Sequence, residues 1–279
     1  MDEEEKIKSA IRRVIEELME RVMNKVLTQD PFIREKHHSS KPLYAALVPD
    51  EIFKCSHFER RFTTPFGKAW EQLAKACAIG FHEHCLINHT IDGLIKQDRL
   101  RRIQEVLNSL EHKGKSQKTS VTPNWSEEIK YIKKGKGQLI PITVICDLFI
   151  DSHKTGKKYA FELKGPLPNS DQTKVSKEKL FKLLAMTPTH VDYAYYALTY
   201  NPYGKRENYS WSHPNRWFNM TLDESVLMGN EFWDLIGGEG TYEMFINEVN
   251  LLGKGYKERI YREFLGIEPP EQSDINILK

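Results

Sequence analysis

The sequence predicts an α/β fold in which a central mixed β-sheet is flanked by helices, with extra N- and C-terminal helices. Two segments rich in β-branched residues, 142–150 and 157–165, are joined by a short linker that carries Gly156, as in a β-hairpin. A third strand is predicted over 191–204. Apolar residues at three- and four-residue steps on either side of these strands indicate amphipathic helices.

The N-terminal segment 3–27 is predicted to form one amphipathic packing helix. Its acidic start complements the positive end of the helix dipole. The segment that follows, 28–64, carries three prolines and a polar run, and is therefore predicted to be irregular. The apolar stripe of the first helix consists of Ile7, Ile11, Val14, Leu18, Val22 and Val26.

Further helices are predicted from the same periodicity. One begins at Pro65, a residue that suits a first helical turn, and buries Phe66 and Trp70. The lysine-rich stretch 113–136 is either a solvated surface or a loop that faces DNA, and the sequence leaves both open. The predicted helices cover residues 65–87, 91–111, 174–186, 222–236 and 240–266.

Composition limits the class of protein. The 279 residues are 39% hydrophobic and 29% charged, which excludes a disordered or collagen-like chain. No apolar run is long enough to span a membrane, and the acidic N-terminal segment has no signal-peptide core, so we expect a cytoplasmic protein. The four cysteines form no CxxC motif and show no zinc-finger spacing. We expect a single domain over residues 1–279.

The predicted hairpin carries a set of charged residues with chemical meaning. Asp147 lies in its first strand, and Glu162 and Lys164 lie two residues apart in its second. Residues two apart in a strand point to the same face, so Glu162 and Lys164 project together and the hairpin can place Asp147 beside them. A surface ion pair between Glu162 and Lys164 would explain the pattern without any function, but such pairs contribute little to stability.

This set of groups suits phosphodiester hydrolysis. Two carboxylates can hold Mg²⁺, which polarises the phosphate and lowers the pKa of a bound water. A lysine beside them can orient the attacking water or stabilise negative charge that develops on the phosphate. Asp147 and Glu162 are therefore the predicted metal ligands, Mg²⁺ is the predicted cofactor with Mn²⁺ as its substitute, and Lys164 is the predicted catalytic cation.

These residues resemble the PD-(D/E)xK nuclease motif: Asp147, fourteen intervening residues, then Glu162-Leu163-Lys164. Cys146 stands where the motif has proline. The resemblance implies a restriction-endonuclease-like core, a further metal ligand in the backbone carbonyl of Leu163, and products with 5′-phosphate and 3′-hydroxyl ends.

The resemblance extends over about residues 60–250. The order of TTPFGKAWEQLA, CDLFI, FELKGPLPN, TYNPYG and GNEFWDLIGGEGTY is similar to that in TdeIII-like type II restriction endonucleases. This implies a prokaryotic, Mg²⁺-dependent enzyme that cuts double-stranded DNA at a short palindrome, of a form such as GGNCC. A cognate DNA methyltransferase is expected in the same system. A fold hosts many specificities, so the resemblance bears on the chemistry more than on the site.

Glu71 is a candidate fourth catalytic residue. It follows Trp70 in a helix that resembles the one preceding the aspartate strand in many nucleases of this superfamily, where a glutamate reaches the metal site. The alternative is a surface pair with Lys75, four residues further along the helix.

Candidate DNA contacts follow the second strand of the hairpin and recur in an aromatic-rich loop at 201–217. Lysine and arginine side chains bind phosphates, and base edges supply specificity. A palindromic target calls for a two-fold symmetric enzyme, so we expect a homodimer. The predicted contacts are Asn169, Gln172, Lys174, Lys177, Lys205, Arg206 and Arg216, with Lys179 and Lys182 considered on the same helix.

Two other functions remain open on the sequence alone. The same hairpin occurs in repair or recombination nucleases that recognise DNA structure and not base sequence. A non-catalytic DNA-binding protein of the same fold is the other alternative, although the intact Asp, Glu and Lys set argues against it.

Overall fold

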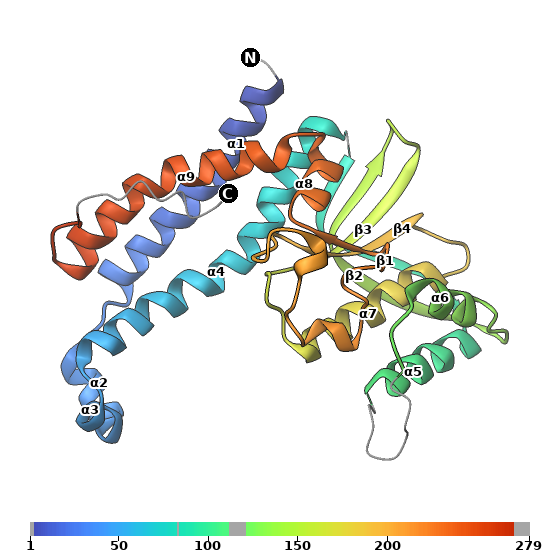
Figure 1. Cartoon of the computed structure of the whole chain (residues 1–279), viewed down its shortest axis with the longest axis horizontal. Coiled ribbons are helices and arrows are strands. Elements are labelled where there is room, and N and C mark those ends of the chain that lie inside the picture. Colours follow the sequence, from blue (N-terminus) through green and yellow to red (C-terminus); the bar gives the residue numbers. More distant parts are fainter. Residues whose placement is uncertain (1–2, 83, 112–120, 271–279) are drawn as a thin grey trace. The chain divides into compact units, whose positions relative to one another are not determined.

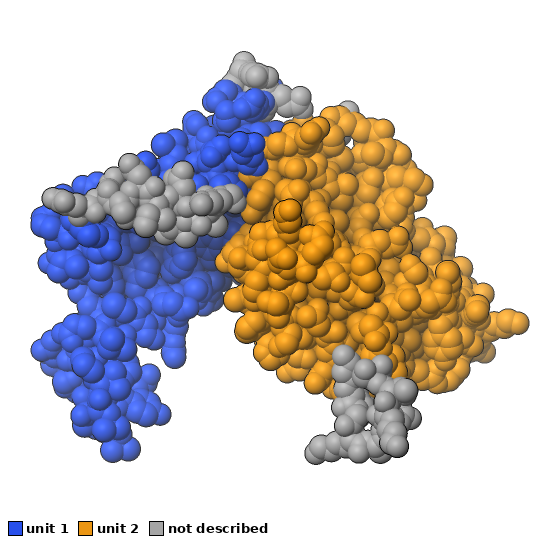
Figure 2. All heavy atoms as spheres, in the orientation of Figure 1, with its two compact units in different colours: residues 1–73, 243–279 blue, residues 74–242 orange. Residues whose placement is uncertain are grey.

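The computed structural model describes residues 3–82, 84–111 and 121–270. The chain forms two compact units: residues 1–73 together with 243–279, and residues 74–242 (Figure 2). The second unit is therefore inserted in sequence between the two parts of the first. Helix α4 (Asp50–Phe81) contributes residues to both units. No helix within the described ranges is both long and apolar enough to cross a membrane.

The second unit is built on a five-stranded sheet in which neighbours in sequence are neighbours in space (Figure 1). The first three strands pair antiparallel, and the last three pair parallel, so the sheet is mixed. This confirms the predicted α/β class. The strands are β1 (His84–Lys96), β2 (Leu139–Ser152), β3 (Lys157–Lys164), β4 (Tyr193–Leu198) and β5 (Val226–Met228).

Strands β2 and β3 form the predicted hairpin. Gly156 has a φ of 64°, which glycine adopts without the steric cost that other residues meet in a tight turn. The pairing runs from Ser152 opposite Lys157 to Leu148 opposite Phe161 and extends no further. Asp147 therefore lies one residue beyond the last paired position of β2, and Glu162 lies one residue beyond that of β3.

Helices cover both faces of β3. Helix α7 (Ser170–Ala185) contacts β3 on the face of Glu162, and α5 (Gln97–Glu111) and α6 (Trp125–Lys133) pack against α7 in turn. On the other face, the ring of Phe161 meets that of Phe232 in α8 (Asn230–Gly237) at a centroid distance of 5.6 Å. The alternation along β3 thus separates the charged side chains from an aromatic layer.

The helix predicted over 91–111 is wrong in its first part. Residues 84–96 form strand β1, and helix α5 begins only at Gln97. Ile91 and Ile95 are spaced as on a helix face, and both are buried. Residues 84–96 pair along nearly the whole length of β2, so tertiary pairing overrides the local pattern.

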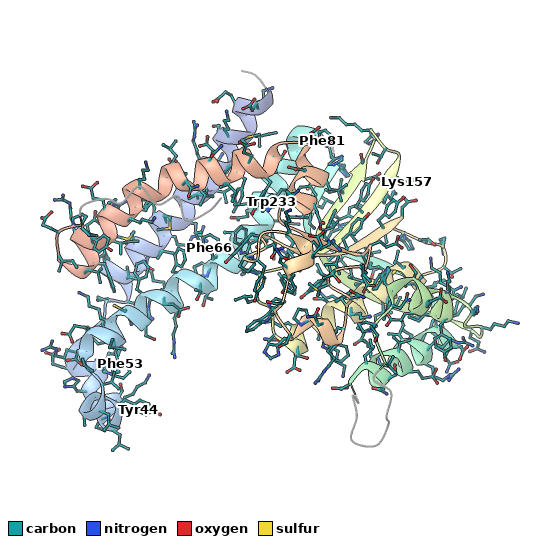
Figure 3. All side chains as sticks on the ribbon, viewed as in Figure 1. Tyr44, Phe53, Phe66, Phe81, Lys157 and Trp233 are labelled. Carbon is teal, nitrogen blue, oxygen red and sulfur yellow. The ribbon has the colours of Figure 1, made fainter. Side chains whose placement is uncertain are left out.

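The first unit consists of helices. Helix α1 (Glu3–Asn24) continues into a π-helical segment, Lys25–Gln29, in place of one uniform helix over 3–27. Its residues Leu18 and Val22 pack with Ala69 of α4, and Phe58, Phe62 and Phe66 of α4 pack against this cluster. Figure 3 labels Phe66 on α4. Helix α9 (Thr241–Arg259), followed by a π-helical segment Ile260–Leu265, completes the unit.

Residues 28–64 are more regular than predicted. They contain the short helices α2 (Arg34–Ser40) and α3 (Pro42–Leu47), and α4 begins at Asp50. Pro65 consequently lies inside α4, where a proline costs about 3 kcal/mol because it removes a backbone hydrogen bond. Aromatic residues repeat every fourth position from Phe58 to Phe66 and pack against the first unit's core. This tertiary packing stabilises the helix on both sides of the proline.

The C-terminal elements differ from prediction mainly at their starts. The helix predicted over 222–236 begins only at Asn230, because strand β5 precedes it. Helix α7 begins at Ser170, four residues before the predicted start. The lysine-rich stretch 113–136 contains helix α6, and part of it, 113–120, lies outside the described residues.

Candidate active site

The site begins where the pairing of β2 and β3 ends. The Asp147 carboxylate accepts a hydrogen bond from the backbone N–H of Leu163, with 2.7 Å between Oδ2 and N. A side chain of β2 thus takes a backbone donor of β3 just past the last paired residues. Because backbone N–H groups need a partner when they are buried, this contact fixes the Asp147 carboxylate relative to β3.

Three oxygen atoms converge on the ammonium group of Lys164. Its Nζ lies 2.9 Å from the carbonyl oxygen of Leu163 and 3.2 Å from Asp147 Oδ2. It also lies 3.5 Å from Glu162 Oε2. The structure therefore brings together the four hairpin residues that the sequence assigns to catalysis or metal binding. Oxygen atoms of three of them surround the ammonium group of the fourth, Lys164.

Glu162 is the buried member of the cluster, with an exposed fraction of 1%. Lys179 of α7 forms an ion pair with its Oε1 at 2.7 Å, and the hydroxyl of Ser176 donates to Oε2 at 3.3 Å. Burial raises the pKa of Glu162, and the negative charge of Asp147 raises it further, while Lys164 and Lys179 act in the opposite direction. The two lysines therefore stabilise the ionised form of a carboxylate whose burial disfavours ionisation.

Cys146, which occupies the proline position of the motif, is a structural residue. It is fully buried, and its Sγ lies 3.6 Å from the carbonyl oxygen of His89 in β1. Burial raises the pKa of its thiol to about 12, so it carries no thiolate at neutral pH. The side chain that precedes Asp147 thus points toward the β1 neighbour and adds no reactive group to the site.

The donor set fits a hard divalent cation. Asp147 and Glu162 supply carboxylate oxygens, Leu163 supplies a carbonyl oxygen, and oxygen donors of this kind are what Mg²⁺ prefers. Within residues 3–82, 84–111 and 121–270, no three His, Cys, Asp or Glu side chains are grouped as a metal centre. The fit therefore depends on the Leu163 carbonyl as well as on the two acids.

Glu71 lies on α4 in the first unit, whereas the hairpin belongs to the second. Its side chain is half-buried. The prediction that it supports the metal cluster stays a prediction.

The predicted DNA contacts on α7 divide into two groups. The Asn169 side chain caps α7 by accepting a hydrogen bond from the Gln172 N–H at 2.8 Å, so it has a structural role. The Gln172 side chain is exposed, and the half-buried Lys174 pairs with Glu111 at 2.5 Å. Lys177 has an exposed fraction of 0% and its Nζ lies 2.6 Å from Glu128 Oε2, so we assign it to the core.

The predicted contacts in the aromatic-rich loop also divide. Arg206 pairs with Glu231 and donates to the backbone carbonyls of Asp223 and Val226, so it fastens the loop to the strand β5 region. Lys205 and Arg216 are exposed. These two remain candidates for DNA contact.

Sequence reasoning missed the roles of Lys179 and Ser176 at Glu162. Both lie on α7, three residues apart and on one face, whereas the sequence groups Lys179 only with lysines that could face DNA. Their spacing on the helix after the Glu-x-Lys strand was a usable signal. The spacing alone does not give the rotation of α7 about its axis, and that rotation decides which face of the helix contacts β3.

Comparison with known proteins places the chain in a family. Residues 7–253 match the family described as type II restriction endonuclease, HinfI. The chain is 28% identical over 231 residues to the type II restriction enzyme HgiCII of Herpetosiphon aurantiacus, covering 81% of this chain and 82% of the relative. It is 27% identical over 245 residues to HgiBI of the same organism, covering 84% and 85%. The TdeIII-like grouping is not confirmed. The chain belongs to the HinfI family of type II restriction endonucleases.

Proposed function

We propose that this chain is a Mg²⁺-dependent endonuclease that hydrolyses phosphodiester bonds of double-stranded DNA at a short palindrome and leaves 5′-phosphate and 3′-hydroxyl ends. The observation that carries the proposal is the convergence of three oxygens of Asp147, Glu162 and Leu163 on the Lys164 ammonium. Membership of a type II restriction endonuclease family supports DNA as the substrate.

The residues divide the chemistry between them. Asp147, Glu162 and the Leu163 carbonyl would hold the Mg²⁺ ion, or Mn²⁺ in its place. When bound, that ion supplies Lewis-acid polarisation of the phosphate and acidifies a water. Lys164 orients the attacking water and stabilises negative charge on the phosphate, because its ammonium already lies among the oxygens of the site.

Lys179 and Ser176 act as positioning residues. They contact the two carboxylate oxygens of Glu162 separately, one at Oε1 and one at Oε2. Contacts of this kind fix the orientation of a ligand and its charge state. Glu71 stays the proposed fourth catalytic residue, as a support for the metal.

Recognition of the palindrome needs two copies of the site related by a two-fold axis, so the proposal includes a homodimer. Gln172, Lys174, Lys205 and Arg216 remain the proposed DNA contacts, since Asn169, Lys177 and Arg206 have structural roles. A GGNCC-like target and a cognate methyltransferase belong to the same proposal.

Digestion of a sequenced plasmid tests this function. Purified protein is incubated with Mg²⁺, with Mn²⁺ or with EDTA, and the ends of the fragments are mapped and tested for 5′-phosphate. The proposal expects discrete fragments that end at one short palindrome only when a divalent ion is present. Cutting that follows DNA structure would indicate a repair nuclease, and binding of DNA without cutting under either ion would indicate a non-catalytic protein.

A further inference from the structure

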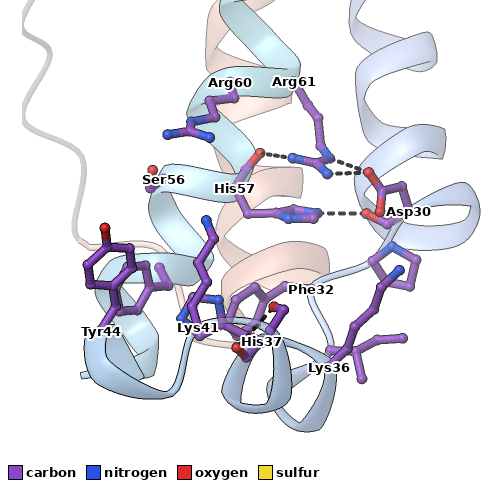
Figure 4. Close-up of a pocket in the computed structure, with 14 residues that line it drawn as sticks. Asp30, Phe32, Lys36, His37, Lys41, Tyr44, Ser56, His57, Arg60 and Arg61 are labelled. Atoms are coloured by element: carbon purple, nitrogen blue, oxygen red, sulfur yellow. Dashed lines mark hydrogen bonds and ion pairs between the residues drawn. The ribbon is translucent and has the colours of Figure 1, made fainter. Parts of the chain in front are cut away.

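A pocket opens in the first unit where α2, α3 and the beginning of α4 meet (Figure 4). Its volume is about 390 Å³. Every residue that lines it lies between Asp30 and Arg61, so none comes from the catalytic hairpin. Nothing in the proposed catalytic chemistry uses this pocket.

The charge of the pocket is strongly positive. Four cationic side chains and one carboxylate line it. That carboxylate, Asp30, accepts hydrogen bonds from Arg61, one of them at 2.8 Å from Nε, and this contact lowers the pKa of Asp30. Among the described residues, Lys36, Lys41 and Arg60 form no ion pair within 4.0 Å, and Lys36 acts on Asp30 only from a greater distance, where its charge also lowers the pKa of that carboxyl. Beyond the Arg61–Asp30 pair, three further positive charges therefore line the pocket.

The walls of the pocket are held in place by contacts between its elements. His57 of α4 lies 2.6 Å, through Nε2, from the backbone carbonyl oxygen of Asp30. Arg61 of α4 donates from Nε to the Asp30 carboxylate at 2.8 Å and, within α4, to the carbonyl oxygen of His57 at 3.1 Å. On the opposite side, the ring of His37 in α2 lies 4.2 Å from that of Phe53 in α4. A site whose walls are fixed before binding loses less conformational entropy when a ligand enters.

Aromatic side chains accompany the cations. Phe32, Tyr44 and Phe53 line the pocket, and Figure 3 labels Tyr44 and Phe53. Tyr44 has an exposed fraction of 59%. His37 Nε2 is buried there without a hydrogen-bond partner. Lysine and arginine bind phosphate groups, and exposed aromatic faces stack on nucleobases. The pocket thus contains cationic side chains, aromatic side chains and a histidine ring nitrogen that has no hydrogen-bond partner.

We propose that this pocket binds a phosphate group of a nucleotide, held by Lys36, Lys41 and Arg60 beside the Tyr44 ring. The nucleotide is either part of a DNA strand or free in solution. If the nucleotide is part of DNA, the inference rests on the proposed function and adds an anchoring point for DNA on the helical unit. If the nucleotide is free in solution, the inference is independent of DNA cleavage.

The test uses the full chain and two charge-matched variants. The pocket variant is Lys36→Gln/Lys41→Gln/Arg60→Gln. The control variant is Lys6→Gln/Arg21→Gln/Lys257→Gln, which removes the same charges from exposed positions of the first unit outside the pocket. All six side chains are exposed, so circular dichroism and urea denaturation should show wild-type folding for both variants.

In the first arm, anisotropy of a short fluorescein-labelled duplex is measured in EDTA at several salt concentrations. Each phosphate contact contributes about 0.9 to the slope of log K against log salt, so loss of one site should lower the slope by about 1. The pocket variant should then bind the duplex roughly ten-fold more weakly at low salt, while the control variant keeps the wild-type slope.

In the second arm, adenosine monophosphate and inorganic phosphate are titrated calorimetrically. Binding that the pocket variant alone loses, with the duplex unaffected, identifies a free nucleotide or phosphate as the ligand. Equal behaviour of the pocket and control variants in both arms would overturn the inference. Plasmid digestion by wild-type protein reports separately on the proposed function, so the two can fail independently.

Discussion

The catalytic hairpin and the α2–α4 pocket both gather cationic side chains, but they differ in what neutralises the charge. At the hairpin, Lys164 and Lys179 each contact a carboxylate of the same unit. In the pocket, Lys36, Lys41 and Arg60 have no such partner among the described residues. A paired cation fixes the position of an acid inside the protein, whereas an unpaired one is available to an anion from outside.

Helix α7 shows the same contrast on a smaller scale. Lys177 and Lys179 are two residues apart, so they lie on different faces of the helix. Lys177 is buried against Glu128, and Lys179 reaches Glu162 while remaining partly exposed. One lysine therefore contributes to the core and the other to the site. The comparison can be tested by removing each cation in turn.

The largest effect is expected from Lys164→Ala. Loss of the ammonium should lower the cleavage rate roughly 10²- to 10⁴-fold, because no other cation contacts both Asp147 and Glu162 among the described residues. Single-turnover cleavage of a plasmid measures it. The matched control is Lys158→Ala, on the same strand and paired with Asp151. An active Lys164→Ala enzyme would contradict the proposed mechanism.

Lys177→Met should act on stability. Removing one partner of a buried ion pair costs about 3–5 kcal/mol, because Glu128 is left with an uncompensated charge. The midpoint of urea denaturation measures the change. Lys182→Met on the same helix removes a half-exposed pair with Glu178 and should cost less than about 1 kcal/mol. Adding Glu128→Gln to Lys177→Met should recover part of the loss, and no recovery would mean that packing dominates.

Lys179→Met should weaken the metal site without unfolding the protein. Loss of a contact that orients a metal ligand typically reduces affinity or activity about 10- to 100-fold. Mn²⁺ titration of the protein and the Mg²⁺ dependence of cleavage are the readouts, with Lys182→Met as the control. Lys179→Arg should restore much of the affinity, since it keeps the positive charge near Glu162. An unchanged metal dependence in Lys179→Met would remove Lys179 from the site.

The smallest effect is a dependence of stability on alkaline pH. Burial lowers the pKa of Lys177 below its ordinary value of 10.5. Between the two pKa values the unfolded chain holds a proton that the folded chain has released, so the free energy of unfolding rises with pH. The rise is at most about 1.4 kcal/mol per pH unit. Urea denaturation at a series of pH values below 10.5 should show it in wild type relative to Lys177→Met. Parallel curves would mean that Lys177 stays protonated.

The hairpin could be predicted from the sequence because its signals are local. The β-branched segments, the glycine at the turn and the alternation of Glu162 with its apolar neighbours all lie within one short stretch. The roles of Lys177 and Lys179 could not be predicted in this way. They depend on which face of α7 meets β3 and which meets α6, and rotation about the helix axis is a property of the packed fold.

Strand β1 and the long helix α4 illustrate the same limit. The four-residue spacing of Ile91 and Ile95 fits one face of a helix as well as one face of a strand, and the pairing with β2 makes the segment a strand. Pro65 is a strong local signal for a helix start, but the aromatic contacts of Phe58 and Phe62 keep the helix continuous before it. In both places long-range contacts outweigh the local preference that sequence reasoning uses.

The insertion of residues 74–242 between the two parts of the first unit has a consequence for synthesis on the ribosome. Domains generally fold as they emerge, N-terminal parts first. Strands β1–β5 and the hairpin are thus all translated before α9 exists. Helix α1 must wait for α9 to supply Glu248, which pairs with its Arg12. A nascent chain of 242 residues would therefore contain the sequence of every strand of the sheet but lack the helix that completes the first unit.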